Sequence, residues 1–218
     1  MSHLIMRQAM RHARPRAIIF DYGNVLTNPQ RADKVRAMSE RVNVSIEAFL
    51  NAYGSGRGAY DAGQPPADYW RLVLQKLGRE ARSSESLIAS LIDDDTESWT
   101  DYREEVWALA RQVRAGGRST AFLSNNVPPL MAHLRAERRL DDIFDNVTAS
   151  CELGIAKPEP GIFLHCIEQL EIAPEQGLFV DDHPPNIAAA ARLGLETFLF
   201  EGDDAARRLR ELVAGPPP

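Results

Sequence analysis

Six residues with chemically useful side chains stand just beyond runs of apolar residues. Each follows such a run directly or lies in the loop after it. They are Asp21, Ser124, Asn125, Lys157, Asp181 and Asp182. Taken singly, each has an ordinary explanation as a turn former, a helix cap or a surface charge. Their joint occurrence in this order is far harder to obtain by accident, and it favours one shared site.

These residue types suit the chemistry of a phosphoryl group. Asp21 and Asp182 offer carboxylate oxygens, which are the ligands that Mg²⁺ prefers. The cation and Lys157 would neutralise a phosphoryl group, while Ser124 and nearby backbone amides would donate hydrogen bonds to its oxygens. A carboxylate beside that phosphorus is a competent nucleophile. Asp21 could therefore form an aspartyl-phosphate.

Such a site needs elements that bring the six residues to one place, and the hydrophobic pattern predicts them. Short apolar runs with β-branched and aromatic residues are typical of buried strands. The runs cover residues 17–20, 119–123, 146–149, 177–180 and 197–200. Helical patterns separate them, which indicates an α/β fold with a doubly wound parallel sheet. In such a sheet, ligands bind beyond the carboxyl ends of the strands, where the six residues are expected.

The segment between the first two predicted strands breaks this alternation. It contains helical patterns joined by loops. The helices are predicted at residues 32–41, 46–52, 67–77 and 84–92. We therefore predict an α/β core of residues 17–29 and 103–218, with an inserted α-helical cap of residues 30–102 over the carboxyl edge of the sheet.

Two segments receive separate predictions. The glycine-rich segment 54–58 is expected to be a loop of the cap, from which Arg57 or Tyr60 could touch a substrate. Residues 1–16 carry four arginines and no acidic residue, and we expect a flexible basic tail there.

Composition limits the possible partners. The formal net charge is -6, which disfavours nucleic acid as a partner, although a bound cation could still attract a phosphorylated substrate. No apolar run approaches the roughly 18 residues of a membrane span. The two cysteines lack a metal-ligand spacing and form no disulfide scaffold. We expect a cytoplasmic monomer or homodimer that acts on a small phosphorylated metabolite, with no nucleic-acid or membrane partner.

The six residues also stand in segments that resemble the four motifs of the haloacid dehalogenase-like hydrolases. The segments are residues 18–26 (IIFDYGNVL), 123–125 (LSN), 154–163 (GIAKPEPGIF) and 179–194, which begins FVDD. The third and fourth are the most specific. A helical insertion after the first motif is similar to the first cap type of this family, which occurs in its dehalogenase and small-molecule phosphatase branches.

The resemblance implies how a metal would be held. Asp21 would be both nucleophile and Mg²⁺ ligand, and Gly23 would lend its backbone carbonyl to the metal. Asp182 would bind Mg²⁺ directly, with Asp181 acting from the same shell or through water.

The resemblance also implies how the phosphoryl group would be bound. Ser124 and Asn125 would bind its oxygens, and Lys157 would stabilise charge on the nucleophile and on the phosphoryl group.

Gly23 departs from the family pattern, in which phosphatases usually carry a second Asp two residues after the nucleophile. A positioned acid–base group is typically worth about 10²- to 10⁴-fold in rate. The substrate could have a good leaving group, such as a sugar 1-phosphate or an acyl phosphate. This agrees with the similarity of Asp-x-Gly-Asn-Val to a branch that includes bacterial α-glucose-1-phosphate phosphatases. Alternatively, His183 or a cap residue substitutes, or the chain only binds phosphorylated ligands.

A dehalogenase is the other enzymatic alternative. Those family members also use an Asp nucleophile without the second Asp, but they attack carbon and need no metal. Their first motif resembles Asp-x-Tyr, whereas Tyr22 stands one position earlier here. The pair Asp181-Asp182 favours a metal site. We therefore predict a Mg²⁺-dependent phosphatase, with an L-2-haloacid dehalogenase-type hydrolase or a non-catalytic phospho-ligand-binding protein as alternatives.

Overall fold

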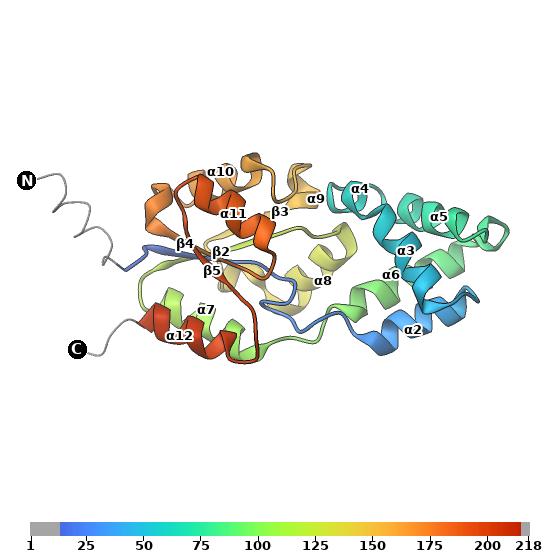
Figure 1. Ribbon diagram of the computed structural model, residues 1–218, viewed down its shortest axis with the longest axis horizontal. Coiled ribbons are helices and arrows are strands. Elements are labelled where there is room, and N and C mark those ends of the chain that lie inside the picture. Colours follow the sequence, from blue (N-terminus) through green and yellow to red (C-terminus); the bar gives the residue numbers. More distant parts are fainter. Residues whose placement is uncertain (1–13, 215–218) are drawn as a thin grey trace, which may run out of the picture.

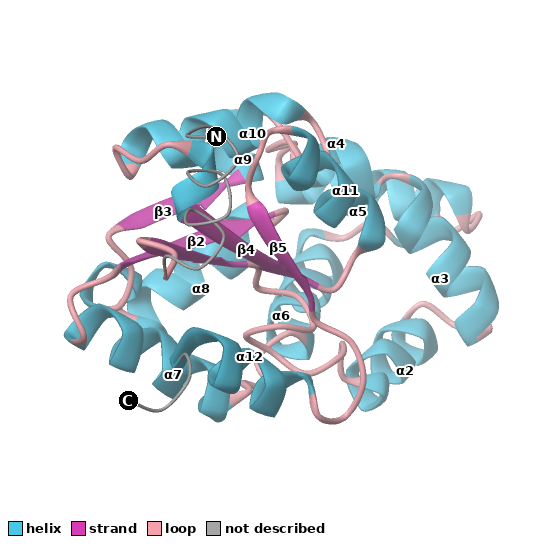
Figure 2. Cartoon of the chain, turned by 60° about the vertical axis from the view of Figure 1, so that its left-hand side comes forward, coloured by secondary structure: helices cyan, strands magenta, loops and turns pink. Residues whose placement is uncertain are grey.

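The computed structural model of the chain describes residues 14–214, and a parallel five-stranded sheet lies at its centre (Figures 1 and 2). The strands are β1 (Ala17–Phe20), β2 (Ser119–Ser124), β3 (Asn146–Ala149), β4 (Gly177–Asp181) and β5 (Glu196–Leu199). Their order is β3-β2-β1-β4-β5, and each neighbouring pair is parallel. The predicted α/β class is confirmed, and each predicted strand lies within one residue of an observed one.

Helices cover both faces of the sheet, as a doubly wound fold requires. Successive side chains of a strand point to opposite faces. Ile18 and Phe20 therefore join one apolar cluster, and Ile19 joins another. The first cluster includes residues of α7 (Glu104–Ala115), α8 (Pro128–Arg138) and α12 (Ala205–Ala214). The second includes residues of α10 (Pro160–Gln169) and α11 (Pro184–Arg192), which lie on the opposite side of the sheet in Figure 1.

Shorter elements complete the core. They are α9 (Ser150–Leu153) and the 3₁₀ helices η2 (Leu140–Asp142) and η3 (Pro174–Gln176), while a third 3₁₀ helix, η1 (Glu80–Arg82), lies outside the core, after residue 76 and before residue 85. Of the predicted basic tail, residues 1–13 lie outside the described part of the chain. The backbone of Arg16 already extends the sheet, since its N–H donates to Gln176 O at 2.8 Å and its carbonyl accepts from Ser119 N at 3.0 Å. Within residues 14–214, no helix has the length and apolarity needed to cross a membrane.

A group of helices lies beyond the carboxyl ends of the strands, on the right of Figure 1. They are α2 (Ala32–Arg41), α3 (Ile46–Ser55), α4 (Arg57–Asp61), α5 (Pro66–Lys76) and α6 (Glu85–Ser98). The side chains of Ser45 and Ser84 cap α3 and α6, as their sequence positions favour. Two linkers join the group to the sheet, and Thr27 pairs with Tyr102 between them. The division into core and cap at residues 30–102 stays a prediction, and we keep the word cap for these helices.

The segment 54–58 is not the loop that its glycines predict. Helix α3 continues through Ser55 and α4 begins at Arg57, so Gly56 alone separates them. A Cβ at Gly56 would lie 3.3 Å from Leu72 Cδ2 and 3.5 Å from Tyr69 Cε2. Gly56 therefore packs closely against α5, whereas Gly54 and Gly58 lie within the helices.

Candidate active site

The carboxyl ends of β1 and β4 bring the three predicted carboxylates together. The two strands are neighbours, with Phe20 opposite Val180, and Asp21 N donates a hydrogen bond of 2.9 Å to Val180 O. Asp21 and Asp181 therefore lie at the same level of the sheet. One carboxylate oxygen from each of Asp21, Asp181 and Asp182 lies within 4.8 Å of the others. This spacing suits a shared cation with oxygen ligands.

The ammonium group of Lys157 is buried between two of these carboxylates. Its Nζ lies 2.7 Å from Asp21 Oδ1 and 2.7 Å from Asp181 Oδ2. It also donates to Leu123 O at 3.1 Å. Burial by itself lowers the pKa of Lys157, but the two carboxylates outweigh burial and hold that pKa above its ordinary value. Lys157 is therefore charged in this site.

Asp21 is held in a position where it gains a proton easily. Burial is the main cause that raises its pKa from 3.8 to about 7, Lys157 opposes the rise, and Asp181 adds to it. Its Oδ1 also accepts a hydrogen bond of 2.7 Å from Tyr22 N. Three carboxylates around one ammonium leave an excess of negative charge, which either a proton or a metal cation can neutralise.

Asp181 and Asp182 differ in how many hydrogen bonds their carboxylates accept from the protein. Asp181 is fully buried and accepts hydrogen bonds from Asn186 Nδ2 at 3.0 and 3.1 Å, from His183 N at 2.7 Å and from Lys157. Asp182 is partly exposed, and its Oδ2 accepts from Asn24 Nδ2 at 2.8 Å. Asp182 consequently has more carboxylate lone pairs free to bind a metal than Asp181.

Gly23 lies two residues beyond Asp21, in the turn that follows β1. A Cβ at this position would come no closer than 4.0 Å to another side chain, the nearest atom being Trp99 Cζ3. The Cβ of a larger residue therefore meets no steric obstacle at this position.

Ser124 is the last residue of β2, which ends one residue later than predicted, and Asn125 follows the strand. Ser124 is buried at the end of the strand. Asn125 is bound at both ends of its amide to the main chain of Lys157: Nδ2 donates to Lys157 O at 2.8 Å, and Oδ1 accepts from Lys157 N at 2.7 Å. Its side chain positions the lysine loop, so the predicted contact with phosphoryl oxygens would fall to its backbone.

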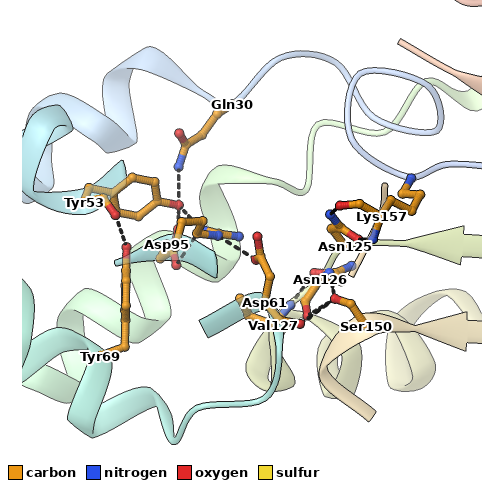
Figure 3. A network of polar contacts seen from close by, with 11 residues as sticks. Gln30, Tyr53, Asp61, Tyr69, Asp95, Asn125, Asn126, Val127, Ser150 and Lys157 are labelled. Atoms are coloured by element: carbon orange, nitrogen blue, oxygen red, sulfur yellow. Dashed lines mark hydrogen bonds and ion pairs between the residues drawn. The ribbon is translucent and has the colours of Figure 1, made fainter. Parts of the chain in front are cut away.

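A buried polar network in the cap approaches this site (Figure 3). Arg57 Nε donates to Asp61 Oδ1 at 2.8 Å. Arg57 also contacts the hydroxyl of Tyr53, which donates to Asp95 Oδ1 at 2.7 Å. Burial raises the pKa of Asp61 and of Asp95. Of the two cap residues predicted to reach a substrate, Tyr60 is fully buried, whereas the side chain of Arg57 stays 22% exposed.

Four polar residues around the site were missed by the sequence predictions. They are Asn24, Asn126, Ser150 and Asn186. Asn24 and Asn126 stand beside predicted site residues, Ser150 follows β3, and Asn186 lies in the first turn of α11. A polar side chain at such positions also fits a turn or a helix start. Asn24 and Ser150 have partners distant in sequence, which only the fold reveals. Asn186 instead donates to Asp181, five residues earlier in the chain.

Comparison with known protein sequences identifies a family and several relatives. A family model described as haloacid dehalogenase-like hydrolase matches residues 15–194. Mouse acyl-CoA dehydrogenase family member 10 is 29% identical over 209 residues, which cover 93% of this chain but only 19% of that protein. D-ribitol-5-phosphate phosphatase of Bacteroides thetaiotaomicron is 29% identical over 194 residues, which cover 83% of this chain and 89% of the relative.

Solved structures agree on the fold. A HAD family enzyme of Bacteroides thetaiotaomicron has a TM-score of 0.75 at 21% identity, covering 91% of this chain and all of that one. The L-2-haloacid dehalogenase of Xanthobacter autotrophicus has a TM-score of 0.61 at 20% identity, covering 92% of this chain and 83% of that one. At these identities the likeness concerns the fold alone.

Proposed function

The chain belongs to the haloacid dehalogenase-like hydrolases, and from this premise we propose that it is a Mg²⁺-dependent phosphatase of a small phosphorylated metabolite, with Asp21 as covalent nucleophile. The observation that carries the proposal is the Lys157 ammonium 2.7 Å from both Asp21 and Asp181, beside a third carboxylate. The phosphatase relative that matches most of both chains supports the substrate class.

The donor set fits Mg²⁺. Hard cations of this kind take carboxylate oxygens, and three carboxylates offer oxygens within 4.8 Å of one another. Asp21 and Asp182 would bind the ion directly, together with the backbone carbonyl of Gly23. Asp181 would act from the same shell or through water. When bound, the ion would neutralise the excess negative charge and the charge of the phosphoryl group.

The residues of the chain then divide the reaction between them. Asp21 attacks phosphorus, so that an aspartyl O–P bond forms while the ester P–O bond breaks. Lys157 keeps its proton and neutralises charge, and Ser124 with the backbone of Asn125 holds the phosphoryl oxygens. Water then attacks the phosphorus of the acyl phosphate, which releases phosphate and restores the Asp21 carboxylate.

Departure of the leaving group is the step for which we assign no general acid. Gly23 carries no carboxyl group to protonate the departing oxygen. We therefore propose substrates whose leaving groups depart readily, with a sugar 1-phosphate as the leading class. Dehalogenation remains the second candidate, because it requires no such acid and the fold is shared with a dehalogenase. The Asp182 carboxylate, held by Asn24 beside the nucleophile, favours the metal-dependent reaction.

Phosphate release from a panel of esters tests this function. The panel contains sugar 1-phosphates, alkyl phosphates and an activated aryl phosphate, each with and without Mg²⁺, and 2-chloropropionate is assayed for halide release. We expect metal-dependent release that ranks with leaving-group quality. Halide release without metal would instead establish the dehalogenase. If no compound released phosphate or halide, a role in binding alone would remain.

The organisation of the chain is part of the same proposal. We propose that residues 30–102 act as a cap over a core of residues 17–29 and 103–218. Cys151 and Cys166 are free, which suits the reducing cytoplasm. We also propose that the chain acts as a monomer or homodimer, which light scattering after gel filtration would measure.

A further inference from the structure

A buried serine connects the cap to the loop that follows β2. Ser150 is the first residue of α9 and has no exposed surface. Its hydroxyl donates to the carbonyl of Asp61 in the cap at 2.5 Å, and it accepts from the backbone N–H of Asn126 at 2.9 Å. Figure 3 shows Ser150 between these two partners. One hydroxyl thus bonds main-chain groups from both sides of the interface.

The cap approaches the core very closely at this point. Gly63 has a φ of +97°, and a Cβ there would lie 2.6 Å from the carbonyl oxygen of Cys151. Any other residue at position 63 would push α4 and its following loop away from α9. This docking point is separate from the two linkers, where Thr27 pairs with Tyr102.

On the core side, further hydrogen bonds link Asn126 to the nucleophile Asp21. Asn126 is buried, and its Oδ1 accepts from Val127 N at 2.9 Å, where α8 begins. The preceding residue, Asn125, binds the main chain of Lys157 with both ends of its amide. Lys157 in turn contacts Asp21 at 2.7 Å. An unbroken series of hydrogen bonds and peptide units therefore runs from the cap to the nucleophile.

We propose that Ser150 is a positioning residue, whose hydroxyl makes the geometry of the loop Ser124–Asn126 depend on the docked cap. A hydroxyl has one proton to donate. If Asp61 moves away, the remaining acceptor near Ser150 Oγ is Asn126 O at 3.4 Å, which is too long for a good hydrogen bond. A buried hydroxyl left in this state favours movement of Asn126 toward it. The identity of the ligand that this loop binds rests on the proposed function.

Two substitutions break the contact from opposite sides. Ser150→Ala removes the hydroxyl, and Gly63→Ala displaces the cap while Ser150 stays intact. Gly78→Ala is the matched control for Gly63→Ala, because Gly78 also has positive φ, at +63°, but nothing lies within 4 Å of its Cβ position. Ser39→Ala is the control for Ser150→Ala, since Ser39 is equally buried and donates within α2 to Arg36 O.

Hydrogen exchange of backbone amides gives the decisive readout, and it needs no turnover. In Gly63→Ala, we expect the amide of Asn126 to exchange about tenfold faster, as loss of one hydrogen bond allows. In Ser150→Ala, the amides of Asn126 and of Gln64 should both exchange faster. The two control variants should match the wild type. An Asn126 amide that Gly63→Ala leaves unchanged would overturn the coupling, whatever the enzyme proves to hydrolyse.

Binding of inorganic phosphate in the presence of Mg²⁺ tests the consequence for the site. Each variant should weaken phosphate binding about tenfold, while Mg²⁺ alone binds as in the wild type. Because both variants break one contact, the double variant should be no weaker than either single one. Additive losses would show that the cap and the loop act independently, and would overturn the proposal. A wild type that binds no phosphate would contradict the proposed function but leave the exchange result standing.

Discussion

Replacing Lys157 with methionine should destabilise the metal-free protein strongly at a pH where the carboxylates are ionised. The side chain of Lys157 is 1% exposed, and methionine keeps a long flexible stem, so packing changes little. The loss is electrostatic: Asp21 and Asp181 lose the ammonium 2.7 Å from each of them. Removing one partner of a buried ion pair typically costs about 3–5 kcal/mol.

The loss of stability in Lys157→Met should depend on pH, and the pKa of Asp21 determines whether it grows or shrinks as pH rises. Burial raises that pKa to about 7, and Lys157 opposes the rise, so the variant should have a still higher value. The folded variant then binds a proton that the unfolded chain, with a pKa of 3.8 for Asp, has already released. Stability is consequently retained at low pH and lost as pH rises toward the folded pKa. Each pH unit in this window is worth about 1.4 kcal/mol.

Urea unfolding in the presence of a chelator, followed by tryptophan fluorescence, measures this effect. At about pH 8 the variant should be about 3–5 kcal/mol less stable than the wild type. At about pH 5.5 the gap should shrink by about 1 kcal/mol, because below a pH of about 7 Asp21 is protonated in the wild type as well. Lys76→Met is the control, because Lys76 Nζ donates to Ser55 Oγ at the surface, and its effect should stay within about 0.5 kcal/mol. Equal stability of Lys157→Met and wild type at the higher pH would refute the claim that Lys157 neutralises buried carboxylates.

Three other predictions concern the missing acid, the metal and the thiols. Gly23→Asp should raise kcat for an alkyl phosphate by about tenfold or more and change that for an activated aryl phosphate little, and a leaving-group series checks this. Asp182→Ala should raise the half-saturating Mg²⁺ concentration about tenfold or more in a metal titration of activity, and an unchanged titration would exclude it as a ligand. Burial raises the pKa of Cys151 to about 11 and of Cys166 to about 12, so both thiols should react with iodoacetamide over about a hundredfold more slowly than a free thiol near neutral pH, as mass spectrometry would show.

The sheet was predictable because the sequence signal for buried parallel strands is local. A run such as Ala17–Phe20 is apolar throughout, as a strand covered on both faces must be. The polar residue that ends the run then marks the carboxyl end of the strand. The sequence therefore predicts that Asp21 and Asp181 lie at one edge of the sheet.

The cap and its docking were only partly predictable, because they depend on contacts between distant residues. Glycines at 54 and 58 predict a loop, but both lie within helices, and Gly56 between the helices packs against Tyr69 and Leu72 of α5. The contact of Ser150 with Asp61 joins residues 89 apart in sequence. A serine after a strand looks like an ordinary helix start, and no local pattern reveals such a partner.

The same reason explains the different results for Asn125. Its position after β2 predicts that it belongs to the site, and the fold places it against the main chain of Lys157. The use of its side chain was not predictable, because its amide binds the main chain of Lys157, 32 residues away. Sequence thus indicates which residues gather, while the structure decides which side chain faces the ligand.

Direct detection of phosphate on Asp21 tests the central claim. The Mg²⁺-loaded enzyme is mixed with the best ester of the panel, quenched in acid within one turnover, and digested for mass spectrometry. We predict a phosphorylated peptide that contains Asp21, with both the modification and phosphate release lost in Asp21→Asn. Phosphate release that persists in Asp21→Asn, or wild-type turnover with phosphate trapped on another residue, would contradict the account.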